Sequence, residues 1–474
     1  MTGQEAAKSQ GLVLWDLPEE IVEQILPEIE LHRDLVSFAC ASRLCTQLVI
    51  PRHTEYRVLR LGTTKSAHIW AHLSRRQDLA STIREIDIEQ VDAEYPCMPS
   101  SLIEDVDREE RTGEVQEEDM IRALGNMYRL KTFGWDYRFI TVPGPTGRHF
   151  APRVFDVLQH VGSVEHFCFN PFERWKFNEP VEECGLWKMS QLRSFVLTTD
   201  KPYWPSSSNP QLIVQWLNSL SYLEFLDLPI EMLSEHHAIL SFPSLRRFKV
   251  SSRHPNMNEV ILNFLERHPL LEKLTWFSNA PAPPHLPEHF LPKLRYLDSR
   301  FDFFQALTSH PATQLSAPRQ FEQLSLTWPH NSGEALGELC SSSGIDRDAL
   351  RVLAISTHQN SQDAQKIAGA FPMLEELSLP NLLKEGESFS LDEFMLGLER
   401  LPHLKVLYRN VVWSDLGLER SGLDPDVDDL QMRLAVAERI QLLARRSSTS
   451  KKRRNGKSQD RGGDVKALVR DECG

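Results

Sequence analysis

A short pattern of apolar and polar positions recurs along most of the chain. It places apolar residues at positions 1, 4 and 6 of a six-residue segment, and IREIDI (83–88) is its first copy. Further copies begin at residues 130, 164, 192, 223, 245, 271, 294, 321, 350, 374 and 404, those at 294 and 404 being weaker. Successive side chains of a strand alternate between faces, so positions 4 and 6 enter one core while positions 3 and 5 face away. Each copy therefore predicts a β-strand.

Helical patterns separate these segments, for example at 211–220, 258–269, 363–372 and 391–402. Three of them run into a proline, which cannot donate a hydrogen bond to a continuing helix. From residue 192 onward the strand segments start 22 to 31 residues apart, a period typical of repeat proteins. Units of this length stack into a solenoid with a parallel sheet on its concave side. We expect an α/β fold of this kind over residues 83–412; an ordinary α/β domain with leucine-rich strands is the alternative.

The N-terminal stretch 12–50 has a helical pattern instead. Pro18 lies at the start of a first helix, and Pro27 should end it because its ring clashes with the preceding turn. Capping residues predict two further short helices, at 35–39 and 43–50. The apolar face of the first helix consists of Leu17, Ile21, Val22, Ile25, Leu26 and Ile29. Three helices within about 35 residues enclose too little core to stand alone, so we expect an apolar face that something else covers.

This stretch resembles the F-box family. The resemblance is carried by Leu17-Pro18-x-Glu20-Ile21, Ile25-Leu26, Asp34-Leu35, the small-residue run from Ala39 to Arg43, and Leu48-Val49. The chain departs from the family at Cys45, where many F-boxes have a tryptophan. The strand–helix units resemble the leucine-rich repeats of many F-box proteins, particularly the divergent fungal ones. Their usual Asn or Cys after the strand is not filled consistently, so these repeats would be irregular.

The resemblance implies the substrate receptor of an SCF-type ubiquitin ligase, a protein-binding subunit of the ubiquitin conjugation pathway. The F-box would dock on a Skp-type adaptor, which links to cullin and RING subunits, and the repeats would hold a protein substrate. Other subunits would carry out the covalent chemistry, so the chain itself would not be an enzyme. The adaptor-binding residues would be Leu17, Pro18, Ile21, Ile25, Leu26, Leu35 and Arg43. The alternatives are a ubiquitin-independent interaction scaffold and a solenoid that binds nucleic acid or nucleotide through a basic patch.

Charge is unevenly distributed along the chain. Residues 89–119 contain twelve acids and two arginines, so we expect a disordered acidic insert there. Residues 51–82 read as a helical connector, 424–446 as a helix that caps the solenoid, and 447–474 as a disordered basic tail. Basic residues of a candidate nuclear import signal are Arg445, Arg446, Lys451, Lys452, Arg453 and Arg454. The net charge of −13 disfavours general nucleic-acid binding, which needs a basic face.

Positions between the buried strand residues would line the concave face. The candidate substrate-binding residues are Phe225, Arg247, Lys249, Lys273, Phe277, Tyr296 and Arg300. A net positive patch with aromatic neighbours would suit an acidic or phosphorylated peptide, because arginine makes charge-assisted hydrogen bonds to such groups. The same patch could instead contact the chain's own acidic stretch, or consist only of solvated strand residues.

Motifs of enzyme chemistry are missing from the sequence. It contains no Gly-x-Ser-x-Gly or His-Glu-x-x-His motif, and Gly456-Lys457-Ser458 lacks the first glycine of a phosphate-binding loop. We therefore expect no catalytic residue, no cofactor and no metal. Seven scattered cysteines predict reduced thiols in an intracellular protein. No apolar run is long enough to span a membrane, so we expect a location in the cytoplasm, the nucleus or both.

Overall fold

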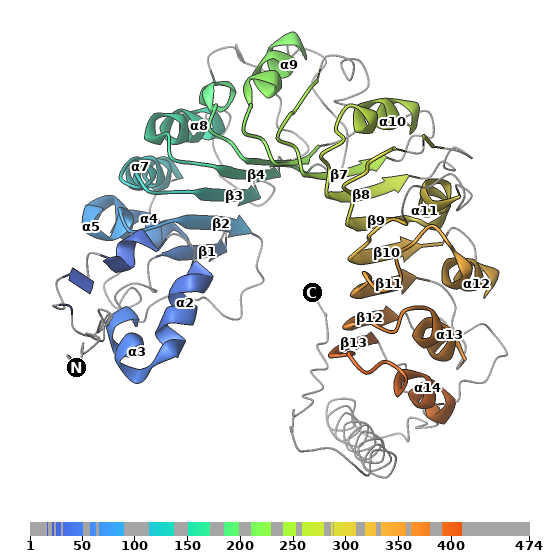
Figure 1. Ribbon diagram of the computed structural model, residues 1–474. Coiled ribbons are helices and arrows are strands. Elements are labelled where there is room, and N and C mark those ends of the chain that lie inside the picture. Colours follow the sequence, from blue (N-terminus) through green and yellow to red (C-terminus); the bar gives the residue numbers. More distant parts are fainter. Residues whose placement is uncertain are drawn as a thin grey trace, which may run out of the picture. The chain divides into compact units, whose positions relative to one another are not determined.

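A computed structural model gives the structure of the chain (Figure 1). It describes residues 17, 21–22, 25–29, 32–50, 57–62, 66–89, 113–136, 150–170, 184–198, 210–228, 240–252, 258–278, 286–287, 289–309, 318–328, 333–356, 362–379 and 391–409. The chain divides into two compact units, Met1–Leu245 and Arg246–Gly474. Each unit is an α/β structure with a parallel sheet, as the sequence predicts.

The first unit begins with a 3-10 turn, η2 (Leu26–Glu28), and the helices α2 (His32–Ala41) and α3 (Arg43–Val49). Its strands are β1 (Val58–Gly62), β2 (Glu85–Glu89), β3 (Thr132–Asp136), β4 (His166–Asn170), β5 (Ser194–Leu197) and β6 (Phe225–Asp227). They are joined through α4 (Ser66–Arg75), α5 (Gln77–Ala80), α7 (Gly113–Gly125), α8 (Phe150–Val161), the 3-10 helix η6 (Gly185–Lys188) and α9 (Pro210–Ser219). The strands neighbour one another in chain order, and α7 and α8 lie on one side of the sheet (Figure 1).

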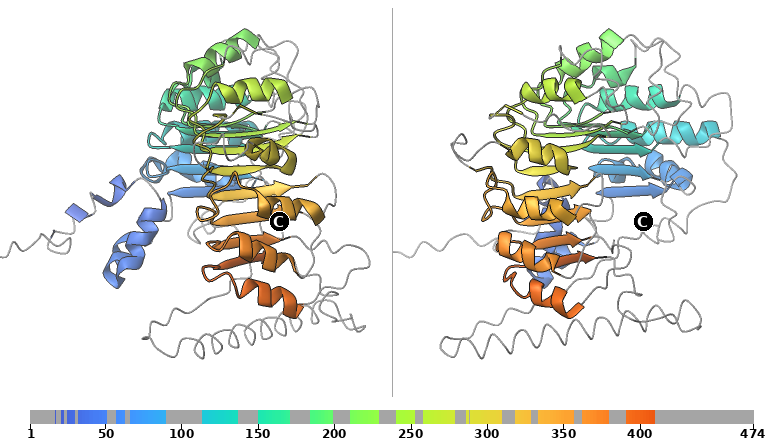
Figure 2. Two further views of the ribbon diagram at one scale, coloured as in Figure 1. Left: turned by 45° about the vertical axis from the view of Figure 1, so that its right-hand side comes forward. Right: turned by 90° about the vertical axis from the view of Figure 1, so that its right-hand side faces the viewer.

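The second unit repeats this plan. Its strands are β7 (Arg247–Ser252), β8 (Lys273–Ser278), β9 (Tyr296–Arg300), β10 (Gln323–Thr327), β11 (Val352–Ser356), β12 (Glu376–Leu379) and β13 (Val406–Arg409). The helices are α10 (Asn258–Glu266), α11 (Phe301–Thr308), α12 (Gly333–Ser341), α13 (Asp363–Ala370) and α14 (Leu391–Leu398). They lie along one face of the sheet (Figures 1 and 2). We call the opposite face, which carries positions 3, 5 and 7 of each repeat, the open face of the unit.

In each unit, neighbouring strands pair so that equivalent repeat positions lie directly opposite each other. Position 4 of each repeat faces position 4 of the next, as in Leu274↔Leu297↔Leu324↔Leu353↔Leu377. In the first unit the same row reads Ile86↔Phe133↔Phe167↔Phe195↔Leu226. All of these side chains are buried, so every repeat adds its apolar positions to a core shared with its neighbours. The prediction of a repeated strand with buried positions 4 and 6 is confirmed.

Position 2 of the repeats forms a charged row that the sequence analysis missed. Its residues are Lys131, Glu165, Arg193 and Glu224 in the first unit, and Arg246, Glu272, Arg295, Glu322, Arg351, Glu375 and Lys405 in the second. From Lys131 onward in the first unit, and throughout the second, the sign alternates from repeat to repeat. Glu165, for example, pairs with Lys131 and with the Arg193 Nε at 3.3 Å, and the Arg193 guanidinium also donates to Glu224 at 2.9 Å. We call this row the edge ladder. Opposite charges on successive repeats favour the observed order of the strands. If one repeat were skipped, like charges would lie side by side.

Two of the predicted segment boundaries are wrong. The connector 51–82 contains α4, as expected, but also β1, the first strand of the sheet, which pairs in parallel with β2. The acidic insert is also shorter than predicted, because 113–119 belongs to α7. Charge did not prevent burial there, since Asp119 is buried and accepts a hydrogen bond from the Ser74 hydroxyl of α4 at 2.9 Å. The remainder of the insert (90–112), the predicted cap 424–446 and the tail 447–474 lie outside the described residues.

Candidate functional site

The N-terminal helices enclose a small core of their own. Five of their side chains are buried together: Val22, Leu26, Leu35, Ala39 and Val49. Leu17, Ile29, Phe38 and Leu48 are partly buried and pack against them. Ser42 caps α3 as predicted, because its hydroxyl oxygen accepts a hydrogen bond from the Cys45 backbone N–H at 3.1 Å. The helix α2 is longer than the predicted 35–39 and starts before Asp34.

Around this core, the same segment leaves an unusual amount of apolar surface in water. Eleven large hydrophobic side chains are exposed in the described chain, and five of them belong to residues 21–50. They are Ile21 and Ile25, each 41% exposed, with Val36, Leu44 and Ile50 at 40%, 48% and 49%. We call these five residues the N-terminal apolar surface. Large apolar side chains that gather in one short exposed segment are typical of a binding site.

The predicted adaptor-binding residues fall into two groups. Ile21, Ile25 and Arg43 are exposed and available to a partner. Leu26 and Leu35, in contrast, are 1% and 0% exposed. Their assignment as contact residues is therefore corrected: they belong to the core and can only support the surface from beneath. Leu17 packs against that core, and Pro18 lies outside the described residues.

Cys45 stands where many F-boxes have tryptophan, and it is fully buried. It does not belong to the N-terminal apolar surface. The departure from the family pattern therefore affects the interior of this segment, not the side chains that it exposes.

Two arginines, Arg57 and Arg129, attach the N-terminal helices to the first strands of the repeats. The guanidinium of Arg57 is buried and donates at 3.4 Å to the carbonyl oxygen of Leu26, the first residue of η2. Arg129 forms an ion pair with Glu28 at 3.4 Å. Arg84 lies beside them, and burial, together with the charges of Arg129 and Arg57, lowers its pKa to about 10. The sequence analysis missed this junction, although Arg84 precedes Lys131 at position 2 and so breaks the alternation of sign.

On the second unit, three predicted cations do lie together. Arg247 and Lys249 on β7 and Lys273 on β8 are all exposed on the open face. Arg247 pairs in register with Lys273, and Lys249 with Thr275. We call these three residues the β7–β8 cation cluster.

In the described part of the second unit, Asp298 is the acid that lies beside the β7–β8 cation cluster. Asp298 of β9 pairs in register with Thr275, and its half-buried carboxyl group is hydrogen-bonded to Ser325. Burial raises the pKa of Asp298, while the Ser325 hydrogen bond and the charges of Lys273 and Lys249 oppose that rise.

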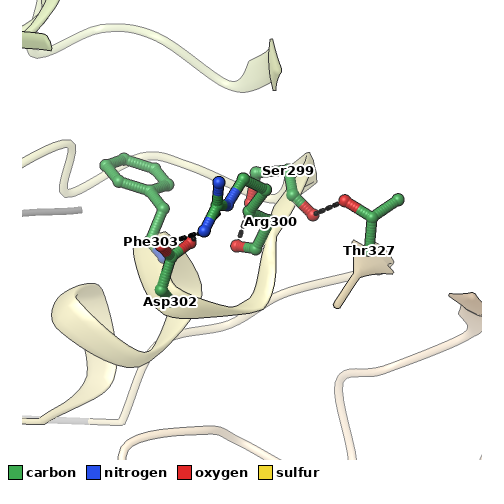
Figure 3. Close-up of polar contacts among 5 residues, drawn as sticks. All are labelled: Ser299, Arg300, Asp302, Phe303 and Thr327. Atoms are coloured by element: carbon green, nitrogen blue, oxygen red, sulfur yellow. Dashed lines mark hydrogen bonds and ion pairs between the residues drawn. The ribbon is translucent and has the colours of Figure 1, made fainter. Parts of the chain in front are cut away.

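Arg300, the fourth predicted cation, is engaged locally. Its Nε and terminal nitrogen donate to the two oxygens of Asp302 at 3.2 and 2.9 Å (Figure 3). Asp302 in turn accepts a hydrogen bond from the Phe303 backbone N–H at 3.0 Å, in the first turn of α11. Nearby, the Thr327 hydroxyl donates to the Ser299 carbonyl oxygen at 3.5 Å (Figure 3). Because Asp302 neutralises Arg300, this residue adds little net charge to the open face.

The three predicted aromatic residues are not equivalent. Phe277 of β8 is 37% exposed on the open face and is available for contact. The Tyr296 hydroxyl donates to Glu322 at 2.8 Å, and this hydrogen bond raises the pKa of Tyr296. Phe225 lies on β6 of the first unit and is half-buried there.

The open face of the first unit has the opposite charge, which the sequence analysis did not notice. Glu85 and Asp87 of β2 and Asp136 of β3 lie on it, with Arg60 of β1 as a cation at its edge. Asp87 pairs in register with Gly134, where a Cβ atom would come within 2.4 Å of an Asp87 carboxylate oxygen. Glycine thus leaves room for the acid to lie across the neighbouring strand.

Within the described ranges, no group of three or more His, Cys, Asp or Glu side chains is placed to hold a metal ion. The same residues contain no helix that is long and apolar enough to cross a membrane. The predicted import-signal residues, Arg445, Arg446 and Lys451–Arg454, lie outside them.

Comparison with known proteins gives only distant likenesses. No family model and no curated protein matches the chain. Among solved structures, the complex of Rad7 and Elc1 in yeast has 12% sequence identity and a TM-score of 0.37, over 79% of this chain and 91% of that one. The leucine-rich repeat-containing protein LegL7 from Legionella pneumophila has 11% identity and a TM-score of 0.36, over 73% and 97%. The TLR13–ssRNA13 complex has 14% identity and a TM-score of 0.30, over 74% and 43%.

These likenesses are too weak to carry an argument about function. The leucine-rich-repeat type of the fold follows from the chain's own strand–helix repeats, from their parallel register and from the buried apolar residues at positions 4 and 6.

Proposed function

We propose that this chain is the substrate-recognition subunit of an SCF-type ubiquitin ligase. In this proposal the N-terminal helices bind a Skp-type adaptor, and through it cullin and RING subunits, while the repeats bind a protein substrate. The observation that carries it is the N-terminal apolar surface, on a helical segment whose sequence resembles an F-box.

The exposed aliphatic side chains fit a protein partner. Burial of apolar surface contributes roughly 25 cal/mol for each Å² that leaves water, and clustered large side chains dominate most interfaces. Ile21 and Ile25 are exposed, and each is next in sequence to a core residue, Val22 or Leu26. The packed core therefore fixes the backbone that carries them before a partner binds. A preorganised surface loses little conformational entropy on binding, which favours a stable complex.

The junction with the repeats supports a rigid receptor. Arg57 bonds to Leu26, the first residue of η2, and Arg129 pairs with Glu28, so the docking helices are attached to the residue before β1 and to the loop before β3. In the proposed mechanism a substrate held on a rigid support raises the local concentration of its lysines near a charged conjugating enzyme. The catalytic groups belong to other subunits.

The test removes the surface and keeps its core. Replacing Ile21 and Ile25 together with glutamate should lower recovery of the adaptor and the cullin by more than about tenfold, because buried anchor residues typically contribute about 2 kcal/mol or more. Val115→Glu with Leu396→Glu is the matched control, since both are exposed aliphatic residues on repeat helices, at 46% and 56%. It should leave recovery unchanged. Thermal unfolding of each variant checks that the repeats stay folded.

The result separates the proposal from its alternative. Adaptor recovery that is equal in the Ile21/Ile25 variant and the wild type contradicts docking through this surface. Recovery of the adaptor without any cullin favours the ubiquitin-independent scaffold.

A further inference from the structure

We propose that the last repeat of the second unit binds the chain's own segment 424–446, which covers the end of the apolar core and shields the outer edge of β13. This inference goes beyond the proposed function and does not depend on it, because it concerns only the second unit and the sequence that follows β13. The structure describes the surface, and the sequence supplies the segment that would cover it.

The apolar rows of the repeats are fully buried until the last repeat. Position 1 is at most 4% exposed in every repeat from Ile83 to Leu374, and position 4 is at most 2% exposed from Ile86 to Leu377. In the last repeat these positions are Leu404 and Leu407, and both are only half-buried. We call these two residues the open leucine pair. Each earlier pair is covered by the repeat that follows it, and β13 is the last strand that the structure describes.

The first strand of the array shows that an end strand can be fully buried. Leu59 of β1 pairs with position 4 of β2 and is only 6% exposed, although β1 is the first strand of the described sheet. Arg57, the residue before β1, is itself buried and donates to the Leu26 carbonyl oxygen, so the N-terminal helices contact this end. The open leucine pair indicates that β13 needs a comparable cover from outside the repeats.

β13 also has an edge without a neighbour in the described sheet. It pairs with β12, from Glu376↔Val406 to Leu379↔Arg409, and no described strand lies on its other side. The N–H and C=O groups of an edge strand can pair with a strand of another chain, which leads to aggregation. A segment across the end of the array would bury the open leucine pair and shield this edge.

The segment 424–446 has the sequence pattern that such a cover needs. Asp424 and Pro425 are suited to the cap and the first turn of a helix. Four apolar residues follow at spacings of four, three and three, as on one helical face: Leu430, Leu434, Ala437 and Ile440. As a helix this stripe would be about 15 Å long, close to the length of about 12 Å that eight residues give α14.

The short separation from β13 favours this occupant over a second copy of the chain or another protein. Residues 410–423 are the only ones between β13 and the segment. A random coil of that length has an end-to-end distance of about 20 Å, and such a linker gives an effective concentration in the millimolar range. A separate protein at micromolar concentration would have to bind about a thousandfold more tightly to displace the segment.

Hydrogen exchange of the full chain tests this contact. Leu430→Asp with Leu434→Asp should raise the exchange of α14 and β13 at least about tenfold, which corresponds to about 1.4 kcal/mol. The matched control adds the same charges on the opposite side of the helical pattern, as Met432→Asp with Ala435→Asp, and should change exchange less than about twofold. A synthetic peptide 424–446 should restore protection of the Leu430/Leu434 variant. It should bind the wild type far more weakly, because the chain's own segment occupies the surface.

A double-mutant cycle identifies the surface that the segment covers. Leu404→Ala should weaken protection of β13 at least about twofold less in the Leu430/Leu434 variant than in the wild type, because the covering segment is already displaced. Leu350→Ala changes the same repeat position two repeats earlier, where the leucine is fully buried, and should have the same effect in both backgrounds.

Several results would overturn the proposal. Unchanged exchange of α14 and β13 in the Leu430/Leu434 variant does so, and so does an equal rise in its matched control, which would make added charge responsible. Protection of β13 that falls on dilution, together with a shift from dimer to monomer in sedimentation, assigns the surface to a second copy. A β13 that exchanges freely in the monomeric wild type leaves the surface to another protein.

A variant that loses more than the cover is also informative. If the Leu430/Leu434 variant loses protection throughout the second unit, including α10 and β8, the added peptide decides. Restoration of protection by peptide 424–446 then supports the proposal, and its failure overturns it. Adaptor recovery plays no part in these readouts, so their outcome is independent of the proposed function.

Discussion

The open faces of the two units differ in charge although the same repeat builds both. On the first unit, Glu85, Asp87 and Asp136 give β2 and β3 an acidic face. On the second, Arg247, Lys249 and Lys273 give β7 and β8 a basic one. Parallel register and burial of positions 4 and 6 are the same in both. The inward positions set the fold, and the outward positions, which no core constrains, are where the units specialise.

The cores of the two units also differ. Both are apolar, but the side chains at position 4 are larger in the first unit. Row 4 of the first unit contains Phe133, Phe167 and Phe195, whose rings stack at 6.1 Å with interplanar angles of 14° and 7°. The corresponding row of the second unit is leucine from β8 to β12. The cores of the two units are therefore filled by side chains of different size. Phenylalanine in one row requires enough space in the neighbouring repeats to hold its ring.

The largest effect should come from the aromatic row. Phe167 also contacts Phe155 and Phe169, at 5.8 and 6.2 Å between ring centroids, so Phe167→Ala should lower the free energy of unfolding by about 3–5 kcal/mol. Leu324→Ala, at the same repeat position in the second unit, should cost about 2–5 kcal/mol. Denaturant unfolding followed by hydrogen exchange assigns each loss to its unit. Phe277→Ala, at an exposed position, is the control.

Exchanging the two residues sharpens the comparison. Phe167→Leu should cost about 1–2 kcal/mol because it leaves a gap between two rings, and Leu324→Phe about 1–3 kcal/mol because it overfills the row. If both exchanges are neutral, the two interiors are interchangeable, and the difference between them has no energetic basis.

The sequence was sufficient for the repeated part of the fold because its signal is cumulative. All twelve predicted strand segments contain a strand, even the weak copies at 294 and 404. The prediction from sequence failed where a segment departs from the common repeat pattern. β1 lies within the predicted connector, and Asp119 lies within the predicted disordered insert, because a linear pattern does not show that Ser74 donates a hydrogen bond to Asp119.

The candidate surfaces were less predictable. Strand parity identified which residues face outward, and Arg247, Lys249 and Lys273 do lie together. It could not show that Asp302 neutralises Arg300, because that contact depends on the turn into α11. Leu26 and Leu35 matched a family motif, but only packing separates the residues that form its core from those that it exposes, such as Ile21.

A smaller effect is expected at the edge ladder, which both units share. Glu165→Arg replaces two ion pairs by two repulsions and should cost about 1–2 kcal/mol, because exposed pairs contribute about 0.2–1 kcal/mol each. Glu272→Arg is the counterpart in the second unit, and Glu399→Arg, at an exposed position outside the ladder, is the control. Thermal unfolding at low and high salt measures the change. A cost that high salt does not reduce would show that the ladder acts through packing and not through charge.

The smallest expected effect is a difference in pH response between the units. His268 of the second unit is the only histidine among the buried residues of the described chain. Its ring lies on Phe264 with 4.1 Å between centroids, and its Nδ1 is 2.6 Å from the Phe264 carbonyl oxygen at the end of α10. Burial lowers the pKa of His268, with Arg267 acting in the same direction and the hydrogen bond opposing them.

The sign of the effect follows from that direction. The unfolded chain binds a proton at His268 near the ordinary pKa of about 6.5, whereas the folded chain resists protonation to lower pH. Stability of the second unit is therefore complete above about pH 6.5 and declines as the pH falls below it. Hydrogen exchange of α10 and β8 at about pH 7.5 and 5.5, corrected for the intrinsic rate, should show this decline, and β4 of the first unit should show less. His268→Gln should flatten the response, while the exposed His289→Gln should keep it. An equal decline in His268→Gln would assign the pH dependence to other groups and remove this difference between the units.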